Sequence, residues 1–289
     1  MPVCKYKEAL IESVNTISKM AFDEDSVTHD VTAVALPIHD KFAVGKIYTR
    51  DSVLFSGSLW LPAVFEVYNQ YQNSDLHYEI VAQDGELCAT GKKIITLEGR
   101  LKDILAIERT LLNFLGRGIG ISSATASFKK ALLQYGAHIQ LLDTRKTLPA
   151  YRFFDKYSVL CGGGQNHRMS LGDRILLKEN HQAFLTFKQK EGLIKEWQKS
   201  GEFYEMEVQS YEELIYALKY NCPHIMLDNF TPEQLKKVAD VEKKNSKFEV
   251  SGGVHLDNIK SYCFDFIDYI SVGALTHSVK TPDLTLLIE

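Results

Sequence analysis

The feature that most constrains the fold is a regular alternation of short strand-like runs with helix-capable segments in the second half of the chain. The strand-like runs are His138–Asp143, Arg174–Lys178, Tyr204–Val208, His224–Asp228, Phe248–Ser251 and Tyr269–Val272. Such alternation is typical of parallel β/α architectures. A complete eight-unit barrel takes roughly 250 residues, whereas this part of the chain supports only six or seven strands. We therefore expect an α/β fold with an incomplete β/α barrel, and an open sheet is the alternative.

The first part of the chain has a different pattern. Apolar residues at helical spacing predict an amphipathic helix over Glu8–Phe22 and another at Leu61–Gln70. Short β-rich runs predict a mostly antiparallel sheet, with a turn at Asp84-Gly85. These runs are Phe42–Thr49, Val53–Ser56, Tyr78–Ala82 and Lys93–Leu97. A further helix, Lys102–Leu115, is expected to bridge the two regions.

Composition excludes several classes of protein. The net charge of -4 and pI near 6.2 argue against a nucleic-acid binder. The five cysteines are odd in number and never form a C-x-x-C pair, so neither a disulfide framework nor a zinc site is indicated. The N-terminus has no apolar signal-like stretch, and no run reaches the roughly 18 apolar residues of a membrane span. We expect a cytoplasmic protein that binds no membrane.

Polar residues follow each strand of the predicted barrel, where ligands of parallel α/β proteins bind. The segment from Asp143 to His181 is the most cationic of these regions, because it has seven Lys or Arg against four Asp or Glu, a net +3 in a chain of -4. A positive region in a negative protein concentrates anions locally. Arg145-Lys146 and His167-Arg168 have the donors that bind carboxylates and phosphates. The alternative is a set of solvated surface charges.

Two further features of this segment have alternative readings. Cys161-Gly162-Gly163-Gly164 precedes His167-Arg168 and forms either a closely approached loop or a simple linker. Lys178 follows a buried strand and either grips an anion, forms a Schiff base, or is a surface lysine. The density of neighbouring cations favours anion binding.

The later strands end in carboxylates and glycine pairs. Glu207 and Asp228 are suited to bind ribose hydroxyls or Mg²⁺, to act as acid and base, or to cap the following helices. Backbone N–H groups at Ser251-Gly252-Gly253 and Gly273-Ala274 are suited to bind phosphate.

Taken in order, these motifs resemble one family. Asp143-Thr144-Arg145-Lys146-Thr147, Cys161 to Arg168, and Lys178-Glu179-Asn180-His181 are similar to the motifs of bacterial quinolinate phosphoribosyltransferase, also called nicotinate-nucleotide pyrophosphorylase (carboxylating). Further matches are Glu24-Asp25, His29 to Thr32, Asp84-Gly85, Glu108 to Leu115, Glu205 to Val208, Met226 to Asn229, Ser251 to Gly253, and Ser271 to Ser278. The resemblance covers nearly the whole chain.

The resemblance implies a fold and a reaction. It implies an N-terminal α/β sandwich from residues 1–115, joined by residues 276–289, and an incomplete β/α barrel from residues 116–275. The enzyme would be a homodimer with shared active sites, possibly a higher oligomer. It would join quinolinate to phosphoribosyl pyrophosphate with Mg²⁺, releasing pyrophosphate and CO₂ and giving nicotinate mononucleotide for NAD synthesis.

The resemblance also implies roles for individual residues. The quinolinate carboxylates would be held by cations, and the phosphoribosyl donor by a lysine, two carboxylates and two loops. The quinolinate group is Arg145, His167, Arg168 and Lys178, with Arg109 from the neighbouring subunit; the donor group is Lys146, Glu207 and Asp228, with Ser251, Gly252, Gly253, Gly273 and Ala274 at the phosphate. Lys146, Lys178, Glu207 and Asp228 are the expected catalytic residues, and Glu207 and Asp228 the expected metal region.

The sequence departs from the family pattern at a few positions. Ala150 and His29 stand where the family often has Gly, Glu179 replaces a frequent Asp, and Gln209 a frequent acid. Gly116 to Gly120 is interpreted as an unusually glycine-rich loop that could alter the barrel entry. Three other functions stay open, namely a related transferase for an acceptor such as nicotinate, a Lys178 Schiff-base aldolase, and a non-catalytic binding protein.

Overall fold

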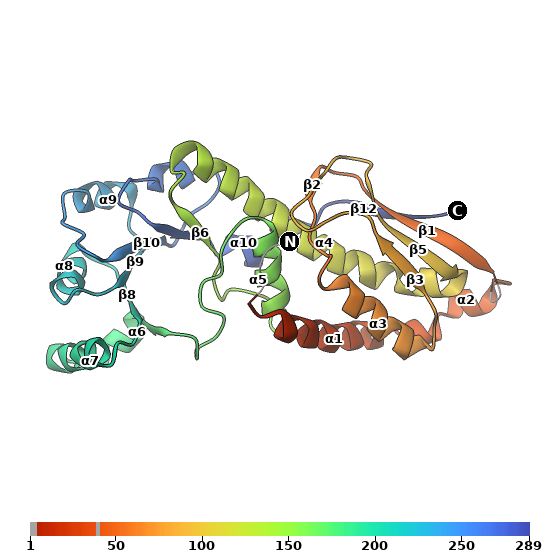
Figure 1. Cartoon of the computed structure of the whole chain (residues 1–289), viewed down its shortest axis with the longest axis horizontal. Coiled ribbons are helices and arrows are strands. Elements are labelled where there is room, and N and C mark those ends of the chain that lie inside the picture. The colour runs from red at the N-terminus through yellow and green to blue at the C-terminus, as the bar shows by residue number, and fades with distance from the viewer. Residues whose placement is uncertain (1–4, 39–40) are drawn as a thin grey trace. The chain divides into compact units, whose positions relative to one another are not determined.

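A computed structural model describes residues 5–38 and 41–289, which form two compact units (Figure 1). The first unit contains the residues up to Ala126 together with Thr147–Gly163 and Leu275–Glu289, and the second contains Ser127–Lys146 and Gly164–Ala274. The division predicted at residue 115 differs from this one, because residue 115 lies within the single helix α4 (Leu101–Tyr135). The chain passes from the first unit to the second inside that helix.

The first unit contains the predicted antiparallel sheet. Its strand order is β12-β1-β5-β3, formed by β12 (Leu284–Ile288), β1 (Phe42–Thr49), β5 (Lys93–Arg100) and β3 (His77–Ile80). All neighbours in this sheet are antiparallel, and the C-terminal β12 pairs with β1. A separate pair joins β2 (Val53–Leu54) to β4 (Leu87–Cys88).

Helices complete the first unit. They are α1 (Lys7–Glu24), the 3-10 turn η1 (Val27–His29), α2 (Val31–Ala35), α3 (Leu61–Gln72), α5 (Arg152–Cys161) and the first part of α4. The amphipathic α1 packs against α3 and α5. Large side chains such as Phe22, Trp60 and Phe65 are fully buried in the shared core, where apolar burial stabilises the unit.

The interpretation of Gly116 to Gly120 as a loop is wrong, because these residues lie inside α4. A Cβ on Gly116 would lie 2.5 Å from the Thr281 side chain, and one on Gly120 would lie 2.7 Å from the Lys280 carbonyl oxygen. The glycines therefore allow the C-terminal segment to approach the helix closely. Although α4 has 35 residues, neither it nor any other helix in residues 5–38 and 41–289 is long and apolar enough to cross a membrane.

The second unit contains one six-stranded sheet in which every pair is parallel. The order is β6-β11-β10-β9-β8-β7, formed by β6 (Gln140–Leu142), β11 (Tyr269–Ser271), β10 (Lys247–Ser251), β9 (His224–Asp228), β8 (Tyr204–Val208) and β7 (Ile175–Leu177). Because β6 and β7 are the two edge strands and do not pair, the barrel is not closed. This confirms the predicted incomplete β/α barrel.

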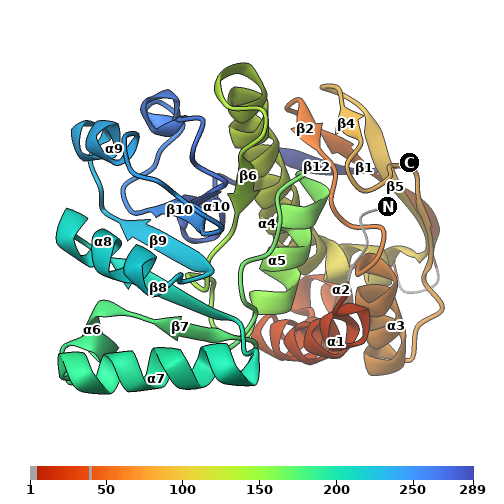
Figure 2. The same ribbon diagram turned by 60° about the vertical axis from the view of Figure 1, so that its left-hand side comes forward.

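Helices follow the strands of the second unit as predicted. They are α6 (Glu179–Gln182), α7 (Phe187–Ser200), α8 (Tyr211–Lys219), α9 (Pro232–Val238), the 3-10 turn η2 (Ile259–Tyr262) and the start of α10 (Ala274–His277). Figure 2 shows α7, α8 and α9 along one side of the strands. The side chains of Ser210 and Thr231 cap α8 and α9, so the alternative that Glu207 and Asp228 cap these helices is wrong.

Candidate active site

The carboxyl ends of the parallel strands bring several predicted residues to one edge of the sheet. Asp228 at the end of β9 is in register with Ser251 at the end of β10, which is in register with Ser271 on β11. Glu207 lies on the adjoining strand, β8, in register with Met226. Since alternate residues of a strand share a face, the strand ends present a row of polar groups.

Lys178 and Glu207 form the central ion pair of this edge. The Lys178 Nζ lies 3.2 Å from a Glu207 carboxylate oxygen, and the Glu179 backbone N–H donates to the other oxygen at 3.3 Å. The Lys178 side chain is 45% exposed, whereas that of Glu207 is 8% exposed. Glu207 is therefore held within the protein by these two contacts, whereas the Lys178 side chain remains partly accessible to solvent.

Asp228 lies within electrostatic reach of this pair. Burial and the charge of Glu207 raise the pKa of the Asp228 carboxyl, while Lys178 and Lys146 act in the opposite direction. Its carboxylate accepts hydrogen bonds from Asn229 Nδ2 at 2.8 Å and from Gln209 Nε2 at 3.4 Å. The four predicted catalytic residues thus influence one another electrostatically.

The turn after β10 is built around the same strand ends. Gly252 has a φ of +92°, and a Cβ there would lie 2.1 Å from the Asn229 side-chain oxygen. Asn229 itself has a φ of +58°, and its backbone N–H donates to the Ser251 carbonyl at 2.8 Å. Only glycine fits at position 252 without displacing Asn229, and Gly253 also has a positive φ of +62°.

The predicted phosphate residues after β11 form a second turn. Gly273 follows this strand, and Ala274 begins the short helix α10. The Val272 backbone N–H donates to the Leu142 carbonyl at 3.0 Å, which ties this turn to the end of β6. The two glycine turns therefore follow neighbouring strands, β10 and β11.

Three arginines of the second unit lie close together. Burial and the nearby charges of Arg145 and Arg174 lower the pKa of Arg168, which Glu205 partly offsets. The Arg168 guanidinium donates to the Arg174 carbonyl at 3.4 Å, and the buried Arg145 Nε has no hydrogen-bond partner within the described residues. Mutual repulsion of these cations makes the region receptive to an anion.

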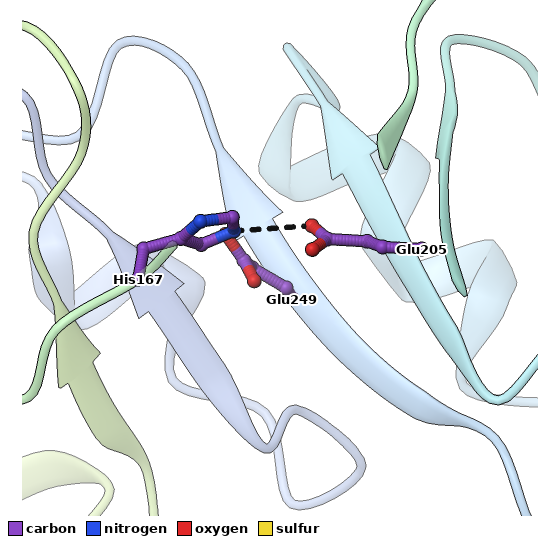
Figure 3. A group of neighbouring side chains, drawn as sticks. All are labelled: His167, Glu205 and Glu249. Carbon is purple, nitrogen blue, oxygen red and sulfur yellow. Dashed lines mark hydrogen bonds and ion pairs between the residues drawn. The ribbon is translucent and has the colours of Figure 1, made fainter. Parts of the chain in front are cut away.

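His167 lies in a buried group of ionisable residues with Glu205 and Glu249 (Figure 3). Its Nε2 is 3.2 Å from Glu205 and 3.6 Å from Glu249. Burial disfavours the charged ring, but the hydrogen bonds to both carboxylates outweigh it and raise the pKa of His167 to about 9. The Arg168 backbone N–H donates to Nδ1 at 2.8 Å, which favours the neutral ring. Both influences leave a proton on Nε2.

Asp143, at the end of β6, holds the loop that contains His167. One carboxylate oxygen accepts the His167 backbone N–H at 2.9 Å, and the other accepts the Asn166 side chain at 2.6 Å. Asp143 is fully buried. The motif residues Asp143 and Asn166 therefore support the site from within the protein.

The Asp143 to His181 segment is not a single cationic surface. Residues 147–163 belong to the first unit, where Lys156 and Asp155 are fully buried. Arg117 pairs with Asp155 through two hydrogen bonds of 2.7 and 2.6 Å. The linker reading of the glycine run does not fit at Gly162, since a Cβ there would lie 2.4 Å from Thr125.

Arg109 belongs to the first unit and is exposed on α4. It lines a cavity of about 390 Å³ together with acidic and apolar residues of the same unit. Glu24 and Asp25, which also match the family motifs, line this cavity too.

The departures from the family pattern have structural correlates. Glu179 and Gln209 contact each other, with Gln209 Nε2 donating to the Glu179 carboxylate at 3.0 Å. Ala150 has a φ of +66°, a conformation that favours glycine. His29 lies in η1 beside Thr28, 2.7 Å from its hydroxyl. Cys161 is buried, and burial raises its pKa to about 12, which indicates packing rather than reactivity.

Glu205, His224 and Glu249 were not predicted as part of the site. Glu205 and Glu249 are completely buried on central strands. The signal in the sequence was an acidic residue inside an otherwise apolar strand, since buried carboxylates are rare unless paired.

The chain matches two family models over most of its length. Residues 30–118 match the N-terminal domain of quinolinate phosphoribosyl transferase, and residues 121–287 match its C-terminal domain. A probable nicotinate-nucleotide pyrophosphorylase (carboxylating) of Methanocaldococcus jannaschii is 35% identical over 277 residues, covering 93% of this chain and 95% of the relative. Its Bacillus subtilis counterpart is 32% identical over 267 residues, covering 92% and 90%.

Solved structures agree with the sequence relatives. The nicotinate-nucleotide pyrophosphorylase of Francisella tularensis has a TM-score of 0.85 and 30% identity, covering 96% of this chain and 97% of that one. Human nicotinic acid phosphoribosyltransferase has a TM-score of 0.59 at 10% identity, with 89% and 72% covered, and shares the fold alone. On the two family models and these relatives, the chain belongs to the quinolinate phosphoribosyl transferase family.

Proposed function

We propose that the carboxyl edge of the six-stranded sheet is the active site at which this enzyme joins quinolinate to phosphoribosyl pyrophosphate. The family reaction gives nicotinate mononucleotide, pyrophosphate and CO₂, and contributes to NAD synthesis. The observation that carries the assignment is the Lys178–Glu207 pair at 3.2 Å, beside Asp228 and a cluster of three arginines. A dicarboxylate acceptor and a polyphosphate donor bring several negative charges together, which only a dense cationic group offsets.

The acceptor would bind to the cations of the second unit. Arg145, Arg168 and Lys178 have donors for the two carboxylates of quinolinate, and charge-assisted hydrogen bonds of this kind contribute about 1.5–3 kcal/mol each. Lys146 is exposed at the end of the β6 loop and would meet the pyrophosphate. The glycine turns at Gly252-Gly253 and Gly273-Ala274 would hold the 5′-phosphate through backbone N–H groups.

The carboxylates would bind the ribose of the donor. Glu207 and Asp228 are hydrogen-bond acceptors at adjacent strand ends, suited to the ribose hydroxyls. The ring nitrogen of quinolinate attacks the anomeric carbon as pyrophosphate leaves. The positive charge on that nitrogen then stabilises the carbanion left when CO₂ departs, and a proton from solvent takes the place of the carboxylate on that carbon. These residues would bind and orient the reactants.

Mg²⁺ is part of this proposal, and the donor set fits it. Glu207 and Asp228 offer hard oxygen atoms, and the raised pKa of Asp228 reflects burial and the nearby charge of Glu207. Two carboxylates alone are too few for an octahedral ion, so the remaining ligands would be water and phosphate oxygens of the donor. The ion would offset the charge of the leaving pyrophosphate.

The test is the reaction itself. Purified protein with quinolinate, phosphoribosyl pyrophosphate and Mg²⁺ should form nicotinate mononucleotide and an equal amount of CO₂. Nicotinate in place of quinolinate serves as the control acceptor. Consumption of nicotinate without reaction of quinolinate would show that the acceptor is assigned wrongly, and borohydride trapping of Lys178 would favour the Schiff-base alternative.

The proposal includes a homodimer in which Arg109 acts in the partner's active site. It is supported by the exposure of Arg109 on a different unit from the other cations. Mixing the inactive variants Arg109→Ala and Lys178→Ala should restore part of the activity, because one of the two mixed sites has both residues intact. No recovery after verified subunit exchange would argue against a shared site.

A cytoplasmic location, consistent with free cysteines at positions 88, 161, 222 and 263, also belongs to this proposal.

A further inference from the structure

The inner face of the parallel sheet has two layers of charged side chains. Glu205 and Glu207 lie two residues apart on β8, and Glu249 and Ser251 two residues apart on β10, so each pair shares a face. We call Glu207, Asp228 and Ser251 at the strand ends the upper layer. The lower layer, one step further into the sheet, consists of Glu205, His224 and Glu249, with His167 placed between the two carboxylates (Figure 3).

Every carboxylate of the lower layer is shared between two or more donors. Glu205 faces His167 Nε2 at 3.2 Å through one oxygen and Arg174 Nε at 3.6 Å through the other. Glu249 faces His167 at 3.6 Å and His224 Nε2 at 2.9 Å. The contacting residues come from one loop and three strands or strand ends. They include Ser271, whose hydroxyl also donates to Glu249.

The two buried carboxylates of the lower layer are unfavourable both for stability and for anion binding, so their presence requires an explanation. Both carboxylates are completely buried, and burial of charge is costly even when paired. Two negative charges beneath an anion site also oppose the ligand's charge. A layer of apolar residues would pack as well at lower cost.

We infer that Glu205 and Glu249 are positioning residues that hold the quinolinate-binding cations through His167 and Arg174, an inference that rests on the proposed function. Glu205 forms an ion pair with the guanidinium of Arg174 at 3.6 Å, without a hydrogen bond, and the Arg174 carbonyl accepts from Arg168 at 3.4 Å. Both carboxylates fix the proton-bearing Nε2 of His167, which leaves Nδ1 to accept the Arg168 backbone N–H at 2.8 Å. Arg168 is thus held at its backbone and at its side chain by groups that the lower layer orients.

His167 therefore acts differently from the role implied by the family resemblance. Its Nε2 faces two carboxylates and its Nδ1 accepts a backbone N–H, and the residue is 7% exposed. With the ring nitrogens directed at protein groups, His167 orients Arg168 rather than holding the substrate carboxylate. The cations nearer the strand ends would make the direct contacts.

His167, Glu205 and Glu249 have the composition of a metal site, since one possible ligand atom of each lies within 4.8 Å of the others. The donors already present argue for a proton instead of an ion. Arg174 occupies one side of Glu205, and His224 and Ser271 occupy Glu249. A cation would meet a guanidinium and would have to displace the Nε2 proton.

The experiment compares Glu205→Gln and Glu249→Gln with the wild type. The glutamine amide introduces a donor facing other donors, so it turns the ring of His167 or releases Arg174. We expect the Kd for quinolinate, measured by isothermal titration calorimetry, to rise about ten- to a hundredfold, the loss of one charge-assisted hydrogen bond. The KM for phosphoribosyl pyrophosphate should stay within about twofold of the wild-type value. A general loss of structure would change this KM as well.

Asp268→Asn is the matched control. Asp268 is also an ion-paired carboxylate that joins β10 and β11, with Lys247 at 2.9 Å and the Phe248 backbone N–H at 2.8 Å, but it lies at the amino ends of these strands. Its replacement should lower the melting temperature and leave the Kd for quinolinate unchanged. If Glu249→Gln does not fold, Glu249→Asp retains the charge but withdraws it from His167, and the same selective loss is expected.

The possible outcomes separate the inference from the proposed function. Unchanged quinolinate affinity in both Gln variants of an active enzyme would overturn the inference alone, as would an equal weakening in Asp268→Asn. A stoichiometric metal whose chelation abolishes quinolinate binding, with phosphoribosyl pyrophosphate binding intact, would also overturn it. A wild type that neither binds nor converts quinolinate would contradict both the proposed function and the inference.

Discussion

The two layers of the parallel sheet have similar residues and opposite properties. In the upper layer Glu207 pairs with a lysine that is 45% exposed, and Asp228 is only partly buried. In the lower layer Glu205 and Glu249 are fully buried, and their partners are buried except for Arg174, whose side chain is 23% exposed. Carboxylates two residues apart on one strand therefore differ in their partners: Glu207 pairs with a half-exposed lysine, whereas Glu205 faces His167 and Arg174 inside the protein. The comparison teaches that position along a strand, more than residue type, separates binding from support.

The largest effect is expected in the upper layer. Lys178→Ala removes the ammonium beside Glu207 and leaves that buried carboxylate without its cation, so turnover should fall by about a hundredfold or more. The melting temperature should also fall, because the buried Glu207 carboxylate loses its ion-pair partner. Lys195→Ala, which removes an exposed lysine paired with Glu191 on α7, is the control. A comparable loss of activity in Lys195→Ala would contradict the special role assigned to the upper layer.

A change in the turn that follows the upper layer should affect stability and donor binding together. Gly252→Ala places a Cβ against Asn229 at a φ of +92°, which costs about 1–3 kcal/mol of unfolding free energy and displaces the neighbour of Asp228. The KM for phosphoribosyl pyrophosphate should rise while quinolinate affinity is retained. Gly192→Ala, in α7 with open space around it, should stabilise by about 1 kcal/mol or less. Urea unfolding and steady-state kinetics measure both quantities.

A smaller and purely structural effect is expected at the far end of the lower layer. His224→Phe keeps the ring stacked on Tyr269, with centroids 5.1 Å apart, but removes the hydrogen bond to Glu249. The unfolding free energy should fall by about 1–2 kcal/mol, and kcat should stay within about threefold. A loss of kcat as large as that of Lys178→Ala would place His224 among the catalytic groups and contradict its assignment to a supporting layer.

The strands and most helices could be predicted because their signals are local. The apolar runs Tyr204–Val208 and His224–Asp228 coincide with β8 and β9, and helical spacing located α1. The five residues from Gly116 to Gly120 could not be placed correctly, since their glycines resemble a loop. Gly116 and Gly120 lack a side chain because Thr281 and Lys280, more than 150 residues later in the sequence, pack against the helix at distances that exclude a Cβ. Such a contact leaves no local pattern.

The site was predictable at the strand ends but not beneath them. Lys178, Glu207 and Asp228 follow or end strands, and the parallel arrangement alone brings them together. Glu205 and Glu249 lie in the interior of strands, where their neighbours are apolar, and their partners are supplied by other strands and by the loop of His167. Pairing of this kind depends on strand order, β8-β9-β10, which the sequence does not state.

The most direct test of the two-layer account compares the two carboxylates of β8. Glu207→Gln and Glu205→Gln are isosteric changes two residues apart on one face of one strand, and kcat is measured with both substrates saturating. We predict that Glu207→Gln lowers kcat by about a hundredfold, whereas Glu205→Gln keeps kcat within about threefold of the wild type once quinolinate is raised to saturation. Equal losses of kcat in the two variants would contradict the account, because the lower layer would then take part in the reaction itself.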